Sequence, residues 1–252
     1  MLHLAAFTES IDNTANNDVA FLQDDYLDNV NSHARLRSPM SLVAAAALCV
    51  DLDRVRIDSP SIRLVGNPFI RPISAALLPP NDPNLMDLTR NPFKLVVGEE
   101  IALQATHTNV AAQRFTGLIW LADRIIPVPM GDIYAVRFTS VTAAVINAWT
   151  TLVITLDQAI APGEYALVGS EVISTNAIAH RWIIPDRPWR PGCLSAQAAG
   201  SRTHKLFYQN GLGEWGRFLN TSLPQLQVLC NVADAVHTGW MYIIRMRSTT
   251  PG

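Results

Sequence analysis

The stretch GEYALVGSEVISTNAIAHRWIIP, residues 163–185, contains two runs that are typical of β-strands. The first run covers 163–174 and the second covers 177–185. Both are rich in valine, isoleucine and aromatic residues, which pack well on a pleated sheet. Asn176 lies between the runs, where a turn is favoured. The stretch therefore predicts two consecutive short strands.

The same pattern extends outward from this stretch in both directions. Short apolar or alternating segments are separated by turns rich in Gly, Pro, Asn and Asp, with no long helical pattern between them. The other predicted strands cover 54–66, 93–108, 114–123, 133–141, 149–157, 225–233 and 238–247. This arrangement indicates a mainly β protein with an antiparallel sandwich or barrel. The number of strands fits one elaborated sandwich better than two, and no internal repeat is visible.

Residues 1–50 are predicted to form an N-terminal extension to a sandwich domain that covers 51–252. Segment 1–33 is acidic and contains no Lys or Arg, and its helical periodicity is weak. We expect it to be partly disordered or ordered only on a neighbouring molecule. Segment 39–50 has the composition of a short Ala-rich helix, with Ser38 as the N-cap and Pro39 at the first helical position. A buried strand is the competing interpretation of 39–50.

The composition favours a protein whose surface is covered by partners. Apolar residues make up 49% of the 252 residues and charged residues only 16%, against an average of about 25%. The net charge of −2 produces no field that would attract nucleic acid. Lys94 and Lys205 are the only lysines, so 17 of the 19 basic residues are arginines, which are preferred in desolvated interfaces.

The sequence contains no recognisable catalytic, cofactor-binding or metal-binding pattern. The six histidines include no pair at metal-ligand spacing, and no GxSxG motif frames a serine. Glu99 and Glu100 are neighbours in a predicted solvated turn, whereas a glycosidase needs two converging carboxylates. We therefore expect a protein that is not an enzyme and carries no cofactor. The three cysteines are widely spaced and are expected to be buried free thiols; they are Cys49, Cys193 and Cys230.

The stretch RWIIPDRPWRPG, residues 181–192, contains three prolines that remove backbone donors and stiffen the chain. It is therefore predicted to leave the sheet as an ordered loop, with Trp189 and Arg190 at a surface or at an end of the sandwich. A stiff loop loses little entropy on docking, and Trp and Arg are enriched at interfaces. The predicted interface residues are Trp182, Arg187, Trp189, Arg190, Trp215 and Arg217.

The C-terminal half resembles β-sandwich virion proteins of tailless icosahedral bacteriophages. The resemblance rests on AWTTLVITLDQAIAPGEYALVGSEVISTNAIAHRWIIPDRPWRPGCLSAQ (148–197) and GLGEWGRFLNTSLPQLQVLCN (211–231). The resemblance covers about residues 95–247 and consists of a shared order of strands, turns and short sequence motifs. It includes no catalytic residues. It implies a jelly-roll major capsid protein that assembles into an icosahedral shell, with a compact double jelly roll as the alternative fold.

This resemblance also implies the partners and the location of the protein. The partners would be other copies of the chain and other capsid or spike proteins, in a virion whose proteins are made in the host cytoplasm. Many capsid proteins begin with a basic genome-binding arm, whereas 1–33 is acidic. Direct, sequence-specific contact with nucleic acid is therefore not expected.

Two other functions remain as alternatives at this stage. A receptor-binding or carbohydrate-binding β-sandwich of a virion spike would use exposed tryptophans against the faces of sugar rings. A cupin-like jelly-roll enzyme would need two or three clustered histidines and a carboxylate.

Overall fold

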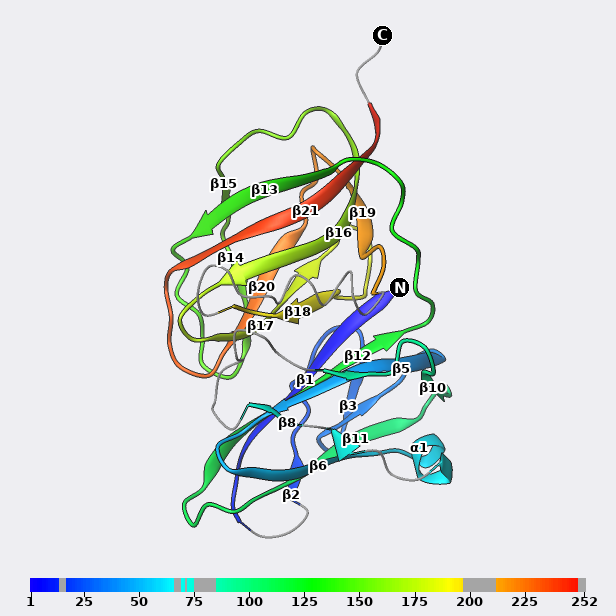
Figure 1. The fold of residues 1–252 in the computed structure, drawn as a ribbon, viewed down its shortest axis with the longest axis vertical. Coiled ribbons are helices and arrows are strands. Elements are labelled where there is room, and N and C mark those ends of the chain that lie inside the picture. The colour runs from blue at the N-terminus through cyan, green and yellow to red at the C-terminus, as the bar shows by residue number, and fades with distance from the viewer. Residues whose placement is uncertain (14–16, 66–68, 71, 75–84, 197–211, 249–252) are drawn as a thin grey trace. The chain divides into compact units, whose positions relative to one another are not determined.

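The computed structural model describes residues 1–13, 17–65, 69–70, 72–74, 85–196 and 212–248. The described chain is mainly β, and its single helix is α1 (Pro60–Val65). It divides into two compact units. The N-terminal unit is Leu4–Arg124, and the C-terminal unit is Ile125–Gly252 together with Met1–His3. Figure 1 shows that each unit has its own pair of sheets.

One sheet of the N-terminal unit has the order β1-β12-β5-β10, and β8 and β9 also pair with β5. Its strands are β1 (Leu2–Ile11), β5 (Met40–Leu48), β8 (Pro72–Ser74), β9 (Met86–Asp87), β10 (Phe93–Leu95) and β12 (Gln113–Ala122). The other sheet has the order β3-β4-β11-β6-β7, with β2 paired to β11. Its strands are β2 (Asn17–Val19), β3 (Asp28–Val30), β4 (His33–Arg35), β6 (Leu52–Asp58), β7 (Phe69–Ile70) and β11 (Glu100–His107).

The prediction of an N-terminal extension over 1–50 is wrong, because these residues supply strands of a sandwich. Of the two interpretations of 39–50, the buried strand agrees with the structure and the helix does not: the segment contains β5, which pairs with β12 and with β10. Nearly all of β5 is buried on both faces, so it shows no alternation of apolar and polar residues. Its alanines favour a helix in isolation, but pairing in the sheet and burial of both faces outweigh that preference.

The acidic residues of 1–33 act as local hydrogen-bond acceptors in an ordered segment. Asp24 accepts hydrogen bonds from the backbone N–H groups of Tyr26 and Leu27, both at 2.9 Å. Asp28 forms an ion pair with Arg37 at 2.7 Å. Strands β3 and β4 form a hairpin through Asn31 and Ser32, both with positive φ, as a two-residue type I′ turn requires. The expected disorder of 1–33 is therefore not found in its described residues.

Helix α1 begins at a serine–proline pair, but not at the predicted one. Ser59 precedes Pro60, and the Ser59 hydroxyl accepts a hydrogen bond from Ile62 N at 3.4 Å. The predicted helix start, Ser38 followed by Pro39, instead leads into strand β5. The same Ser-Pro signal therefore precedes a helix at one position and a strand at the other.

In the C-terminal unit, the larger sheet has the order β15-β13-β21-β16-β19. Its strands are β13 (Ile133–Ser140), β15 (Thr155–Leu156), β16 (Gly163–Ile173), β19 (Gly216–Leu219) and β21 (His237–Ser248). The smaller sheet has the order β14-β20-β17-β18. Its strands are β14 (Trp149–Leu152), β17 (Ala177–Ile183), β18 (Gly192–Leu194) and β20 (Gln225–Cys230). The two runs that opened the sequence analysis are β16 and β17, one in each sheet.

The core of the C-terminal unit lies between these two sheets. Phe138 on β13 meets Trp182 on β17 edge to face, with ring centroids 5.7 Å apart. Both side chains are fully buried. Such a contact joins the two sheets by apolar burial and by favourable ring geometry.

The boundary predicted after residue 50 is not where the described structure divides. The chain divides after Arg124, so 51–124 belongs with 4–50 in the N-terminal unit. The mainly β, antiparallel and sandwich-like architecture is confirmed. Among the described residues, no helix has the length and apolar character needed to cross a bilayer.

Candidate interaction surface

The loop after β17 closes on its own unit. Asp186 has a φ of 58°, and Arg187 N donates to Ile184 O at 3.1 Å, which forms a tight turn. Trp182 N donates to Pro191 O at 2.7 Å and ties the two ends of the loop together. The prolines take 184–191 out of the sheet, as predicted, and the turn returns it to the sandwich.

Trp189 and Arg190 were predicted at a surface or at an end of the sandwich; both are buried, so the surface placement is wrong. Trp189 is 8% exposed, and its Nε1 donates to Trp215 O at 3.3 Å. Arg190 is 9% exposed, and its backbone N donates to His3 Nδ1 at 3.1 Å. The Arg190 guanidinium also donates to Arg187 O at 2.8 Å. These contacts hold both residues inside their own subunit.

The other predicted interface residues do not form one surface. Trp182 and Trp215 are core residues. Arg187 and Arg217 are exposed, but Arg217 pairs with Glu214 at 2.9 Å. Of the six candidates, only these two arginines present much side-chain area to a partner.

The structure shows a different exposed region, at one end of the C-terminal sandwich. Six aliphatic side chains lie there, with exposed fractions between 48% and 84%. They are Val141, Val145, Ile146, Val153, Val232 and Val236, and we call them the aliphatic end surface. They belong to the loop after β13, the residue after β14 and the loop before β21, so they come from strands of both sheets.

Hydrogen bonds between the loops bring these residues together. Ser140 pairs with His237 across β13 and β21, so the two loops start side by side. Ala144 N donates to Asp234 O at 2.7 Å, which ties the first loop to the second. Val153 N donates to Thr142 Oγ1 at 3.0 Å. These contacts hold the loops next to each other although their residues are up to 95 positions apart (236 − 141 = 95) in the sequence.

Asp234 is the only charged residue in segments 141–148 and 231–236. Its carboxylate accepts hydrogen bonds from Ser174 Oγ at 2.7 Å and from Asn176 N at 3.1 Å. Burial acts to raise the pKa of Asp234, but these donors and Val236 N outweigh it and hold the pKa below its usual value. The aliphatic end surface therefore carries one negative charge at neutral pH.

Ser174, Asp234 and His237 do not have the geometry of a nucleophilic triad. The Ser174 hydroxyl lies between the Asp234 carboxylate and His237 Nδ1, at 2.7 Å and 3.0 Å. In a triad the imidazole takes the middle position. Burial lowers the pKa of His237 and outweighs the nearby Asp234 carboxylate, so the ring is neutral. The cluster supports the loops beneath the aliphatic end surface.

A second polar cluster lies in the core of the same unit. His180 Nε2 is 2.7 Å from Ser170 Oγ, and His180 Nδ1 is 3.2 Å from Ser195 Oγ. Trp182 Nε1 also donates to Ser170 Oγ, at 2.8 Å. A neutral imidazole, with one donor and one acceptor nitrogen, satisfies this arrangement. Burial lowers the pKa of His180 to about 3, so the neutral form persists.

The three thiols of the chain are buried. Cys49, Cys193 and Cys230 are free and buried, as predicted, and burial raises the pKa of all three thiols. Within the described ranges, no group of three or more His, Cys, Asp or Glu side chains has the spacing to hold a metal ion.

The prediction that Glu99 lies in a solvated turn is wrong, because Glu99 is buried beside α1. Its carboxylate accepts hydrogen bonds from Ser61 N at 2.6 Å, Val96 N at 2.8 Å and Ser59 Oγ at 2.9 Å. Burial acts to raise the pKa of Glu99, but these donors outweigh it and lower the pKa. Glu99 therefore stabilises the fold above the pKa of the unfolded carboxyl, and this contribution is lost as the pH falls through the folded pKa.

We expect Glu99→Gln to lower the free energy of unfolding of the N-terminal unit by about 1 kcal/mol at neutral pH, because the amide accepts with only one oxygen. Urea unfolding followed by circular dichroism measures this change. Glu100→Gln is the matched control, since Glu100 is more exposed, and its effect should stay within about 0.5 kcal/mol. Equal effects of the two substitutions would contradict the buried role of Glu99.

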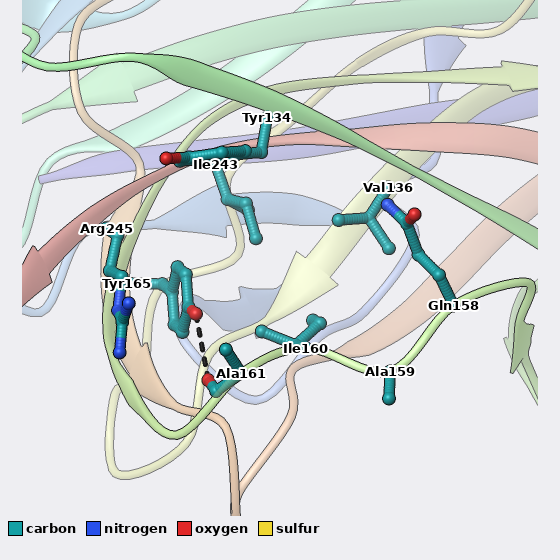
Figure 2. A pocket seen from close by; sticks show the side chains of 9 residues that line it. All are labelled: Tyr134, Val136, Gln158, Ala159, Ile160, Ala161, Tyr165, Ile243 and Arg245. Carbon is teal, nitrogen blue, oxygen red and sulfur yellow. Dashed lines mark hydrogen bonds between the residues drawn. The ribbon is translucent and has the colours of Figure 1, made fainter. Parts of the chain in front are cut away.

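A pocket of about 240 Å³ lies at the other end of the larger sheet. Figure 2 shows Tyr134, Ile243 and Tyr165 on neighbouring strands, with segment 158–161 along the opposite side of the pocket from Tyr134. The Tyr165 hydroxyl donates to Ala161 O at 2.8 Å and fixes that segment. Arg245 is the only charged side chain that lines the pocket.

No protein-family model matches the chain, and no curated protein matches it in sequence. The crystal structure of the major capsid protein P2 from bacteriophage PM2 matches over 100% of both chains, with 11% sequence identity and a TM-score of 0.26. A TM-score this low does not establish a common fold. The description of the fold therefore rests on the strand pairing within this chain.

Proposed function

We propose that this protein is a capsid subunit in which each unit is a jelly roll, and that copies of it assemble into an icosahedral shell. The observation that carries the proposal is a shared pattern of strand pairing in the two units. A jelly roll contains eight strands in two sheets, and it occurs in viral capsid proteins among others.

In the C-terminal unit, eight strands remain when the two-residue β15 is set aside. The first pairs with the last, the second with the seventh, the third with the sixth and the fourth with the fifth. These antiparallel pairs are β13 with β21, β14 with β20, β16 with β19, and β17 with β18. A long hairpin rolled into two sheets produces this nested order, which supports a jelly roll.

The N-terminal unit has the same nested order. Its outermost pair is β1 with β12, and inside it β2 and β4 both pair with β11. Further in, β5 pairs with β10 and β6 with β7. Two successive nested hairpins in one chain support the compact double jelly roll that the resemblance left open.

A jelly roll alone does not decide the function, because lectin and cupin domains share it. The capsid role is favoured by the low charge of the chain, by the exposed aliphatic end surface and by the resemblance over 95–247. A contiguous exposed apolar region usually marks a protein contact. We propose no catalytic role, and we propose the virion as the location of the protein.

The alternative of a carbohydrate-binding spike protein required exposed tryptophans, and the structure does not have them. All six tryptophans lie in the described residues, and none of them is exposed. Trp149 is half-buried, and the Arg181 guanidinium lies over its ring, 4.1 Å from the centroid. Trp240 is also half-buried, so none of the six tryptophans is a fully exposed platform for a sugar ring.

Sedimentation velocity and negative-stain electron microscopy of the full chain test the proposed function. We expect closed oligomers or shells whose fraction rises with protein concentration. A single 27.7 kDa species at every concentration and ionic strength would contradict the proposal. Binding to a glycan array by such a monomer would support the spike alternative instead.

A further inference from the structure

The two exposed apolar regions of the C-terminal unit lie at opposite ends of the same strands. Tyr134 pairs with Ile243 at the pocket end, and Ser140 pairs with His237 at the aliphatic end. The six-residue separation along β13 corresponds to about 20 Å at the rise of a β-strand. The pocket and the aliphatic end surface of one copy are therefore separate sites on the same sheet.

The volume of the pocket matches that of one or two amino-acid side chains. Its volume of about 240 Å³ is smaller than the range of about 300–1,000 Å³ that is usual for small-molecule sites. Its walls are mainly aliphatic and aromatic, from Val136, Ile160 and Ile243 together with two tyrosines. One or two branched aliphatic side chains fit a site of this size and chemistry.

The charges at the two ends are complementary. Arg245, the charged side chain that lines the pocket, donates to Pro162 O at 2.6 Å and is exposed. The aliphatic end surface carries only the negative charge of Asp234. A contact between two aliphatic ends would bring two Asp234 carboxylates together, whereas a contact between an aliphatic end and a pocket brings opposite charges together.

We propose that the pocket of one copy receives aliphatic side chains from the aliphatic end surface of a second copy, in a head-to-tail contact. This inference rests on the proposed function, because it names the surfaces through which capsid subunits associate. A head-to-tail contact uses two different surfaces on each copy and closes into a ring when the rotation between copies permits.

Two substitutions of exposed residues test the contact without disturbing the core. Val145→Glu places a charge on the aliphatic end surface, and Tyr134→Glu places a charge in the pocket; the two side chains are 61% and 49% exposed. Each variant alone should associate at least about tenfold more weakly than the wild type, as at an interface hot spot. Val110→Glu is the matched control, because Val110 is 92% exposed and lies in the N-terminal unit.

An equimolar mixture of the two variants gives the decisive result. The Val145→Glu chain keeps an intact pocket and the Tyr134→Glu chain keeps an intact aliphatic end, so one heterologous contact can form. Native mass spectrometry should detect a heterodimer of the two chains, and few homodimers. If the wild type assembles but the mixture stays monomeric, or if both variants assemble like the wild type, the inference is wrong and the proposed function stands. A wild type that never assembles overturns both.

Discussion

Trp189→Ala should lower the free energy of unfolding of the C-terminal unit by about 3–5 kcal/mol, as do other deletions of large buried side chains. Trp189 is 8% exposed and donates to Trp215 O, so alanine leaves a cavity and removes this hydrogen bond. Urea unfolding followed by tryptophan fluorescence measures the change. The fluorescence reports mainly on the C-terminal unit, because Trp120 is the only tryptophan in the N-terminal unit.

Arg187→Ala is the matched control for this prediction. Arg187 is in the same loop and lies over the Trp189 ring, 5.3 Å from its centroid, but its side chain is exposed. Its loss should cost no more than about 1 kcal/mol, as for an exposed cation–π contact. If Trp189→Ala costs as little as Arg187→Ala, then Trp189 is not a core residue and the loop is free to dock on a partner.

Acidification from about pH 7 to about pH 5 should lower the free energy of unfolding of the C-terminal unit by about 2 kcal/mol through His180. Burial lowers the pKa of His180 from 6.5 to about 3, so the unfolded state binds the proton more tightly than the folded state. Stability therefore falls by about 1.4 kcal/mol per pH unit below 6.5. His237, whose pKa is also lowered, acts in the same direction.

Urea unfolding at the two pH values measures this loss, and His180→Gln is the control. The variant starts from a lower stability, but its loss between the two pH values should be smaller by about 2 kcal/mol, because glutamine does not titrate. Asp234 and Glu99 have lowered pKa values, so both act at lower pH. A wild type whose stability is unchanged between the two pH values, or a native His180 that titrates near 6.5 in NMR spectra, would contradict the buried neutral network.

The strands of the C-terminal half were predictable because they are local patterns. Segments such as 133–141 and 163–174 are short runs rich in β-branched and aromatic residues. The structure places β13 and β16 there. Segment 54–66 also alternates, yet its second half forms α1. Alternation at two or three positions does not distinguish a strand from a single helical turn that begins at Ser59 and Pro60.

The strands within residues 1–50 were not predictable from local pattern, unlike β6, β11 and β12 of the same unit. Strand β5 is buried on both faces, which removes the alternation that identifies a half-buried strand. The acidic residues of 1–33 suggested disorder, but Asp24 and Asp28 are paired with groups nearby in the sequence. Strand β5 is decided by long-range pairing with β12, whereas the acidic segment is held by these local contacts.

The candidate surface was missed for a related reason. Tryptophan and arginine are enriched at interfaces, so the composition of 181–192 predicts an interface. A loop whose tryptophan packs on the core of its own subunit has the same composition. Val141, Val153 and Val236 carry no signal individually, because single exposed valines are common. They become a surface only when β13, β14 and β21 bring their loops to one end of the sandwich.

Hydrogen–deuterium exchange of the assembled and the dissociated protein tests most directly the central claim that copies associate through the exposed apolar regions of the C-terminal unit. We predict that backbone amides in 141–148, 158–161 and 231–236 exchange more slowly in the assembled state. Amides in 184–191 should not change, because Trp189 and Arg190 are already buried in the subunit. Slower exchange confined to 184–191 or to the N-terminal unit, with 141–148 and 231–236 unchanged, would contradict the claim.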